Sequence, residues 1–199
     1  MRVLVYDRTC VTRGRGLSLP WAAGARMYRA MGRIDRARGV ASWAEAFAWL
    51  GAQLDRIEEL QYWGHGHWGQ ALIGGESFDA SALARGHALH DPLKKIRFAK
   101  DALVWFRTCE TVGATRGIAF AESLADALGT RVAGHTFVIG WHQSGLHGVA
   151  PGARADWSPD EGLAEGTASD PRRAHWSAKH EPRTITCLDG SIPSDWIAQ

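Results

Sequence analysis

Residues 102–106 read ALVWF, an unbroken apolar run in the middle of the chain. Such a run predicts a strand that is buried on both faces, as the central strands of parallel sheets are. The next residues, 115–129 (TRGIAFAESLADALG), are periodic in a way that predicts a helix ending at Gly129. Residues 131–140 (RVAGHTFVIG) then predict another strand. A strand, a helix and a strand in this order indicate a βαβ unit with parallel strands.

The same alternation extends toward the N-terminus. The elements predicted there are a strand over 2–6 (RVLVY), helices over 20–32 and 42–54, a strand over 57–63 (IEELQYW), a short strand and turn over 70–78, and a helix over 79–89 capped by Asp79. Ser42 and Glu45 form a capping box at the start of the second helix. Strands alternating with helices of these lengths predict an α/β fold with a mostly parallel sheet and helices on both faces.

The length of the chain and the distribution of residue types along it indicate one domain over residues 1–199. The regular alternation occupies a core over residues 1–140. Residues 141–199 are rich in Gly, Pro and Asp and are expected to be irregular, with one strand candidate over 183–189. No internal repeat and no linker to a second domain is visible.

Composition narrows the classes of partner and the compartment. The formal net charge is only +2, without a basic stripe, so a nucleic-acid partner is not expected. No apolar run is long enough to span a membrane, and no signal peptide is visible. The chain has 3 cysteines, an odd number far apart, which favours free thiols in a reducing compartment. A cytoplasmic protein without a membrane partner is therefore expected.

Two of the predicted strands are followed by residues that could carry chemistry. The strand over 57–63 leads into His65, and the strand over 102–106 leads into Cys109. Ligands bind at the carboxyl ends of strands in open α/β sheets, so if the two strands are parallel neighbours, the two residues emerge side by side at one edge. A thiol beside an imidazole can perform nucleophilic acyl transfer. The N–H groups of Gly66 and Cys109 could then bind the developing oxyanion.

Two other interpretations of these residues remain open at this point, a structural cysteine and a metal site. An isolated cysteine after a strand is more often a core residue than a nucleophile. A histidine-rich metal site is also conceivable, with ligands drawn from His65, His67, His87, His90, His135, His142 and His147. The chain has no C-x-x-C and no H-E-x-x-H motif, so no metal or other cofactor is expected. A metal-dependent hydrolase is kept as an alternative.

The arrangement resembles the caspase-like cysteine peptidases, a superfamily that includes caspases, gingipains, legumain, separase and bacterial CHAT domains. The likeness is nearest to little-characterised bacterial caspase-like domains. It is carried by His65-Gly66, Gly69, Cys109, Gly113, Gly117, Phe120, Leu124-Ala125, Gly129 and Val132-Ala133. It covers residues 57–140 well, residues 1–56 only in the order of elements, and residues 148–157 weakly.

The resemblance implies a three-layer α/β/α sandwich with a mostly parallel caspase-like sheet. It also implies His65 as the catalytic base and Cys109 as the nucleophile, since the family places a histidine about 50 residues before the cysteine. The chain departs from the caspase signature Q-A-C-x-G, because it has RTCETVG at that point. The preference of caspases for their substrates is therefore not carried over.

The resulting hypothesis is a cysteine endopeptidase or amide hydrolase that acts on a protein or peptide through a thioester, without a cofactor. The alternative on the same fold is a binding or effector module with an inactive site. In caspase-like folds the loop after the first strand helps to line the substrate pocket. Arg8, Arg13 and Arg15 of that loop would favour an acidic side chain. Asp7, Glu110 or Asp156 would instead favour a basic one.

Overall fold

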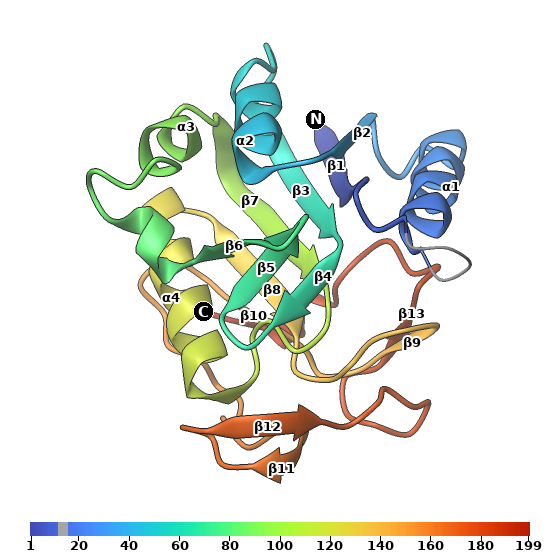
Figure 1. The fold of residues 1–199 in the computed structure, drawn as a ribbon, viewed down its shortest axis with the longest axis vertical. Coiled ribbons are helices and arrows are strands. Elements are labelled where there is room, and N and C mark those ends of the chain that lie inside the picture. Colours follow the sequence, from blue (N-terminus) through green and yellow to red (C-terminus); the bar gives the residue numbers. More distant parts are fainter. Residues whose placement is uncertain (12–15) are drawn as a thin grey trace.

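The computed structural model describes residues 1–11 and 16–199, and within them one large sheet forms the centre of the molecule (Figure 1). Its seven strands, in spatial order, are β14 (Ile197–Ala198), β10 (Leu146–Val149), β8 (Arg131–His135), β7 (Phe98–Arg107), β3 (Ile57–Trp63), β1 (Arg2–Asp7) and β2 (Arg36–Val40). The five strands from β8 to β2 are mutually parallel, and β10 is antiparallel to β8. The predicted α/β fold with a mostly parallel sheet is confirmed.

Strand β7 occupies the middle of this sheet, between β3 and β8. Every residue from Ala102 to Phe106 is buried, so the ALVWF run is the central strand that its composition predicts. Trp105 packs in one core cluster and Phe106 in another, because successive side chains point to opposite faces. The unbroken apolar run is therefore explained by burial on both faces of the sheet.

Helices flank both faces of the sheet. They are α1 (Ser18–Ala30), α2 (Trp43–Gly51), α3 (His90–Lys94) and α4 (Ala114–Leu128). Phe47 of α2 and Phe120 of α4 pack with Val3, whereas Tyr28 of α1 packs with the neighbouring Leu4 on the opposite face. Strand β1 has β2 on one side and β3 on the other, so the chain reverses direction across the sheet there. Right-handed crossovers then place α1 and α2 on opposite faces.

The capping signals in the sequence act largely as predicted. The Ser42 hydroxyl accepts a hydrogen bond from the Glu45 N–H at the start of α2. The Glu45 carboxylate accepts from the N–H of Ala41, one residue earlier than in a standard capping box. Gly129 ends α4 in the left-handed conformation, with φ of 61°. A glycine adopts this conformation without the steric cost that a side chain brings.

The predicted helix over 79–89 is wrong. Asp79 caps only a short 3₁₀ helix, η1 (Ala80–Leu83), by accepting a hydrogen bond from the Ser81 N–H. Gly86 has a φ of 90°, which a right-handed helix does not allow, and α3 begins only at His90.

The histidine-containing loop also has more structure than expected. It forms a small antiparallel sheet of β4 (His65–His67), β5 (Gln70–Ile73) and β6 (Glu76–Asp79). Gly74 and Gly75 make the turn between β5 and β6, both with positive φ.

Residues 141–199, expected to be irregular, contribute two strands to the main sheet. β10 and β14 extend it beyond β8, and the remaining short strands pair as β9 (His142–Gln143) with β13 (Ile185–Thr186) and β11 (Leu163–Gly166) with β12 (Pro171–Ala174). The short 3₁₀ helix η2 (Ser194–Trp196) precedes β14. Ile185 and Ile197 pack against Leu103 and Trp105, so this segment covers part of the sheet face. The strands are too short to show a periodic pattern in sequence.

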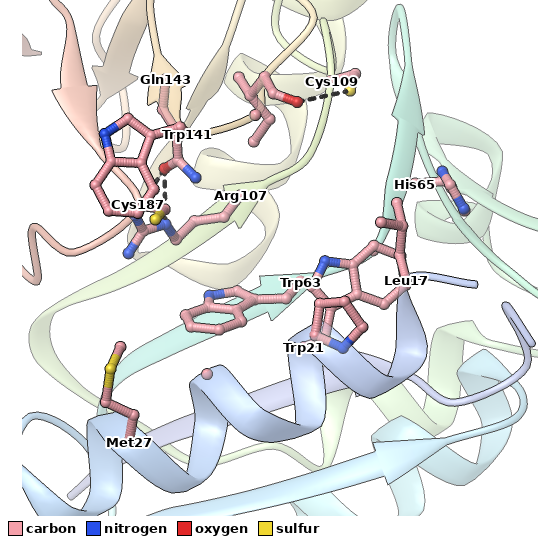
Figure 2. A pocket seen from close by; sticks show the side chains of 15 residues that line it. Leu17, Trp21, Met27, Trp63, His65, Arg107, Cys109, Trp141, Gln143 and Cys187 are labelled. Atoms are coloured by element: carbon pink, nitrogen blue, oxygen red, sulfur yellow. Dashed lines mark hydrogen bonds between the residues drawn. The ribbon is translucent and has the colours of Figure 1, made fainter. Parts of the chain in front are cut away.

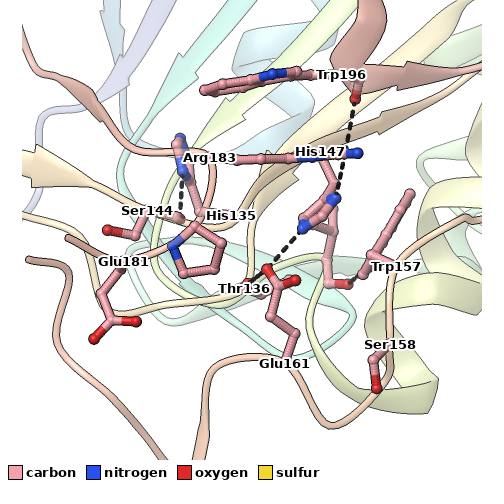
Figure 3. Close-up of polar contacts among 12 residues, drawn as sticks. His135, Thr136, Ser144, His147, Trp157, Ser158, Glu161, Glu181, Arg183 and Trp196 are labelled. Atoms are coloured by element: carbon pink, nitrogen blue, oxygen red, sulfur yellow. Dashed lines mark hydrogen bonds and ion pairs between the residues drawn. The ribbon is translucent and has the colours of Figure 1, made fainter. Parts of the chain in front are cut away.

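A partly buried polar network links β10 and the residue that follows β8 to the loops that carry Glu161 and Arg183 (Figure 3). His147 Nε2 lies 2.7 Å from Glu161 Oε1, which also accepts a hydrogen bond from Thr136. Arg183 Nη1 lies 2.7 Å from the Nδ1 atom of His147. A guanidinium can only donate, so the Nδ1 atom of His147 is the acceptor in this contact. In the part of the chain that the structure describes, no helix is both long and apolar enough to cross a membrane.

Candidate active site at the carboxyl edge of the sheet

A pocket of about 360 Å³ opens where β3 and β7 end (Figure 2). Its walls come from five parts of the chain: α1 and the residue before it, the end of β3, the end of β7, the segment around residue 140, and residue 187. The lining residues are Leu17, Pro20, Trp21, Gly24, Met27, Trp63, Gly64, His65, Arg107, Cys109, Ile139, Gly140, Trp141, Gln143 and Cys187. The pocket lies at the carboxyl edge of the parallel strands, where ligands of α/β proteins bind.

His65 enters the pocket from the small sheet that follows β3. The main strand ends at Trp63, and His65 begins β4, with its side chain exposed. Its Nε2 atom lies 3.2 Å from the Sγ atom of Cys10. The ring of Trp21 meets the imidazole edge-on, with the ring centroids 5.4 Å apart. The imidazole is thus held between helix α1 and the loop that follows β1.

Cys109 enters from a tight turn that follows β7. The Thr108 and Thr111 hydroxyls lie 2.5 Å apart across this turn, and Glu110 adopts a φ of 43° within it. Burial raises the pKa of the Cys109 thiol, although a contact from Sγ to the Ile139 carbonyl, at 4.0 Å, opposes the effect. The thiol is therefore protonated at neutral pH and needs a base before it can attack.

The structure brings His65 and Cys109 to the same pocket, as the adjacency of their strands predicts. Within the described residues no hydrogen bond joins the two side chains, and the thiol that contacts the imidazole is that of Cys10. Gly66 lies directly against the turn that carries Cys109. A Cβ atom on Gly66 would come within 2.7 Å of the Cys109 carbonyl oxygen, so only glycine fits there.

Two of the charged residues expected to select the substrate, Asp7 and Arg8, lie elsewhere. Asp7 is buried, and its carboxylate accepts hydrogen bonds from the N–H and hydroxyl of Thr9. Arg8 forms an exposed ion pair with Glu45 at 3.2 Å. Neither side chain lines the pocket that holds His65 and Cys109. Arg13 and Arg15 lie outside the described residues.

The two remaining acidic candidates are also away from this pocket. Asp156 forms an ion pair with Arg183 at 3.6 Å, beside the network of Figure 3. Glu110 Oε1 lies 2.7 Å from His67 Nδ1 in a second pocket, of about 310 Å³, which does not include His65 or Cys109. Burial raises the pKa of Glu110, and the His67 hydrogen bond opposes that effect. His67 therefore has a carboxylate partner that its place in the motif does not predict.

Arg107 lies at the floor of the first pocket and has no role in the sequence hypothesis. It is buried, with its guanidinium 5.5 Å from the ring centre of Trp63 and 4.5 Å from that of Trp105. Its hydrogen-bond acceptors are Gln143 Oε1, at 2.9 Å from Nε and 2.7 Å from Nη2, the Thr186 carbonyl at 3.2 Å, the Tyr28 hydroxyl at 2.7 Å and the Asp189 carbonyl at 2.9 Å.

The aromatic walls of the pocket were also not predicted from the sequence. Trp21, Trp63 and Trp141 line it. The only signal of this in the sequence is the unusual number of tryptophans, 10 in all, which does not say where they gather.

No group of three or more His, Cys, Asp or Glu side chains in the described part of the chain is arranged to hold a metal ion. Comparison of the chain with protein-family models, with curated proteins and with solved structures finds no match. The geometry of the site is therefore the basis of the functional argument.

Proposed function

We propose that the protein is a cysteine-dependent amide hydrolase, most simply a caspase-like peptidase with Cys109 as the nucleophile and His65 as the base. One observation carries the proposal. Strands β3 and β7 are parallel neighbours in which Trp63 is paired with Arg107, and the residues that follow them bring an imidazole and a thiol into one pocket. The helices on both faces of the sheet support the three-layer sandwich of that family.

The proposed reaction has two halves. In the first, His65 takes the proton of the Cys109 thiol as Sγ attacks the carbonyl carbon of the scissile amide. The imidazolium then returns that proton to the leaving amine, so that the C–N bond breaks and a thioester remains on Cys109. In the second half, a water molecule loses a proton to His65 and attacks the thioester. The acid product leaves, and the thiol regains its proton.

The raised pKa of Cys109 fits this sequence of steps. A buried thiol stays protonated until a base arrives, so the free enzyme would not hold a reactive thiolate. In the proposed cycle His65 gives up its contact with Cys10 and turns to Cys109 when substrate fills the pocket. Catalytic hydrogen bonds are often loose in a free enzyme and tighten with substrate.

The position of Gly66 supports an oxyanion site at the same place. Its backbone lies against the turn that carries Cys109, because no Cβ separates the two segments. We assign the N–H groups of Gly66 and Cys109 to the developing oxyanion, where such donors are worth roughly 3–4 kcal/mol each. All three cysteines are free, which suits the reducing, cytoplasmic setting that we propose for this chemistry.

A second candidate is a binding module on the same fold. The observation that favours it is the contact of His65 with Cys10, which leaves the protonated Cys109 without a base.

The two candidates are separated by a thiol-directed probe that requires catalytic attack, a peptidyl acyloxymethyl ketone, together with a fluorogenic peptide-amide library. We expect labelling at Cys109, loss of labelling and hydrolysis in Cys109→Ala, and a loss of at least ~100-fold in His65→Ala. Cys10→Ala, which removes the other thiol near the imidazole, should keep both activities. If Cys10→Ala abolishes activity and Cys109→Ala does not, Cys10 is the nucleophile. If no cysteine is labelled and no peptide is cut, the binding module is the better description.

A further inference from the structure

We infer that the pocket beside Cys109 takes a large apolar side chain, aromatic above all, from the acyl side of the scissile bond. This inference rests on the proposed amide hydrolase and names its substrate class. Among the described residues it takes the place of the charge-based expectations, because Asp7, Arg8, Glu110 and Asp156 do not line this pocket.

The first argument is the chemistry of the walls. Helix α1 and the residue before it contribute Leu17, Pro20, Trp21 and Met27, and Trp63 stands at the end of β3. The opposite wall holds Ile139 and Trp141. Cavities of this volume and composition are typical of sites for apolar groups, with a few polar atoms to orient the ligand. The imidazole of His65 and the thiol of Cys109 are the polar groups that would meet the scissile bond.

The second argument is the exposure of the apolar residues at this site. Trp141 is 60% exposed, Leu17 is 42% exposed and Met27 is 38% exposed, and all three line the pocket. Large apolar side chains gathered at one concave place on a surface mark a binding site more often than scattered ones do. Covering them with an apolar group would stabilise the complex by about 25 cal/mol per Å² removed from water.

The third argument concerns Arg107, which is the only Asp, Glu, Lys or Arg residue in the described lining of the pocket. Its five N–H groups all have acceptors within the chain, two of them on the Gln143 side-chain oxygen. Trp63 and Trp105 cover its guanidinium. A substrate carboxylate could reach a guanidinium N–H only by displacing one of these buried partners, at a cost of roughly 1–3 kcal/mol. The described lining also holds no carboxylate that could pair with a basic side chain.

The shape of the pocket is set by a glycine in the middle of α1. A Cβ atom on Gly24 would come within 2.6 Å of Cζ3 of Trp63, so the indole lies flush against the helix backbone. The absence of a side chain at this position lets Trp63 and Trp21 stand as two aromatic walls of one cavity. A flat ring is the group that fits best between such walls, because aromatic pairs gain about 0.5–1.5 kcal/mol beyond burial.

The test measures binding without chemistry. Fluorescein-labelled peptides that end in Ala-Ala-Ala-X-amide, with X as Phe, Leu, Ala, Asp or Arg, are titrated against the Cys109→Ala variant by fluorescence anisotropy. We expect the Phe peptide to bind at least ~10-fold more tightly than the Ala peptide, a difference of about 1.4 kcal/mol. The Leu peptide should lie between them, and the Asp and Arg peptides should bind no better than Ala.

Two tryptophan variants sharpen the result. Trp141→Ala, in the Cys109→Ala background, should reduce the Phe-to-Ala preference to less than ~3-fold, since it removes one wall. Trp176→Ala is the matched control, because Trp176 is 72% exposed and lines the second pocket instead. It should leave the preference unchanged.

The inference is overturned if the Asp or the Arg peptide binds most tightly, if Trp141→Ala weakens all five peptides equally, or if no preference can be measured. Hydrolysis by the unmodified enzyme is scored separately. A Phe preference without hydrolysis would refute the proposed hydrolase and leave the apolar pocket standing. Hydrolysis together with an Asp preference would support the proposed hydrolase and refute the apolar pocket.

Discussion

The Nε2 atom of His65 lies 3.2 Å from the Sγ atom of Cys10, whereas Cys109 shares a pocket with His65 without a hydrogen bond to it. Cys10 follows the first strand of the sheet, and His65 follows the third. Strand β1 is the direct neighbour of β3, which explains why the segments that leave these strands meet. The imidazole thus contacts one thiol and shares a pocket with another, and in the proposed cycle it moves from the first to the second.

The first prediction concerns the reactivity of Cys109 in the free protein. Because burial raises its pKa, the thiolate fraction at pH 7 should be smaller than that of an ordinary thiol. The rate of alkylation by iodoacetamide, followed by peptide mapping, should therefore be lower at Cys109 than in N-acetylcysteine. This rate should rise about tenfold per pH unit between pH 7 and 9. His65→Ala should leave this slope unchanged without substrate. A rate that is flat between pH 6 and 8 would show that a thiolate is already present.

The second prediction tests the close fit between β4 and the nucleophile turn. Gly66→Ala places a Cβ within 2.7 Å of both the Cys109 carbonyl and the Thr108 Cβ. We expect the free energy of unfolding to fall by about 1–3 kcal/mol and the two segments to move apart. Urea titration measures the loss. Gly140→Ala is the control, since nothing lies within 4 Å of its added Cβ, and it should unfold as the unmodified protein does. Equal stability of the two variants would contradict the packing described here.

The third prediction concerns the network that holds the C-terminal segment. Burial acts to raise the pKa of Glu161, but its hydrogen bond with His147 and others outweigh this, and the pKa is lowered. A carboxyl group whose pKa is lowered by folding stabilises the folded state at pH values above its unfolded pKa. This stabilisation is lost as the pH falls through the folded pKa. Glu161→Gln should lower the free energy of unfolding at pH 7 by roughly 1–3 kcal/mol. Glu165→Gln, at an exposed ion pair with Arg173, should change it by no more than about 0.5 kcal/mol.

The fourth prediction follows from His135, which is fully buried in β8. Burial lowers its pKa to about 3, so the side chain stays neutral in the folded state where an unfolded histidine would bind a proton. Below pH 6.5 the unfolded state therefore gains protons that the folded state does not, and this residue should reduce stability by about 1.4 kcal/mol for each pH unit. His135→Gln should flatten the stability curve between pH 6.5 and 4.5, measured by urea unfolding at each pH. The exposed His180→Gln should not, and an unchanged slope in His135→Gln would refute the assignment.

Local sequence patterns predicted the centre of the fold. The ALVWF run could only be a strand with both faces covered, and the capped, periodic helix that follows had to return the chain to a parallel neighbour. The common site of His65 and Cys109 rested in addition on the condition that the strand over 57–63 lies parallel to this run and next to it, and the structure shows β3 and β7 as parallel neighbours.

The contacts within the site and the residues that form its walls could not be predicted from the sequence. The contact of Cys10 with His65 joins residues 55 positions apart, and the Arg107 contacts with Thr186 and Asp189 span 79 and 82 positions. No periodicity records such contacts, because each depends on how whole elements pack. The helix predicted over 79–89 failed for a related reason, since the conformation of Gly86 outweighed the helix-forming residues around it.

The sequence by itself thus determined the parallel sheet and the edge at which the candidate site lies, since apolar periodicity is a local property that burial demands. The tertiary structure was needed to place α1 and residues 139–143 and 187 around that edge. Those segments meet only after the crossovers and the C-terminal strands have packed, and their meeting gives the pocket its aromatic walls, its buried Arg107 and the second thiol beside His65.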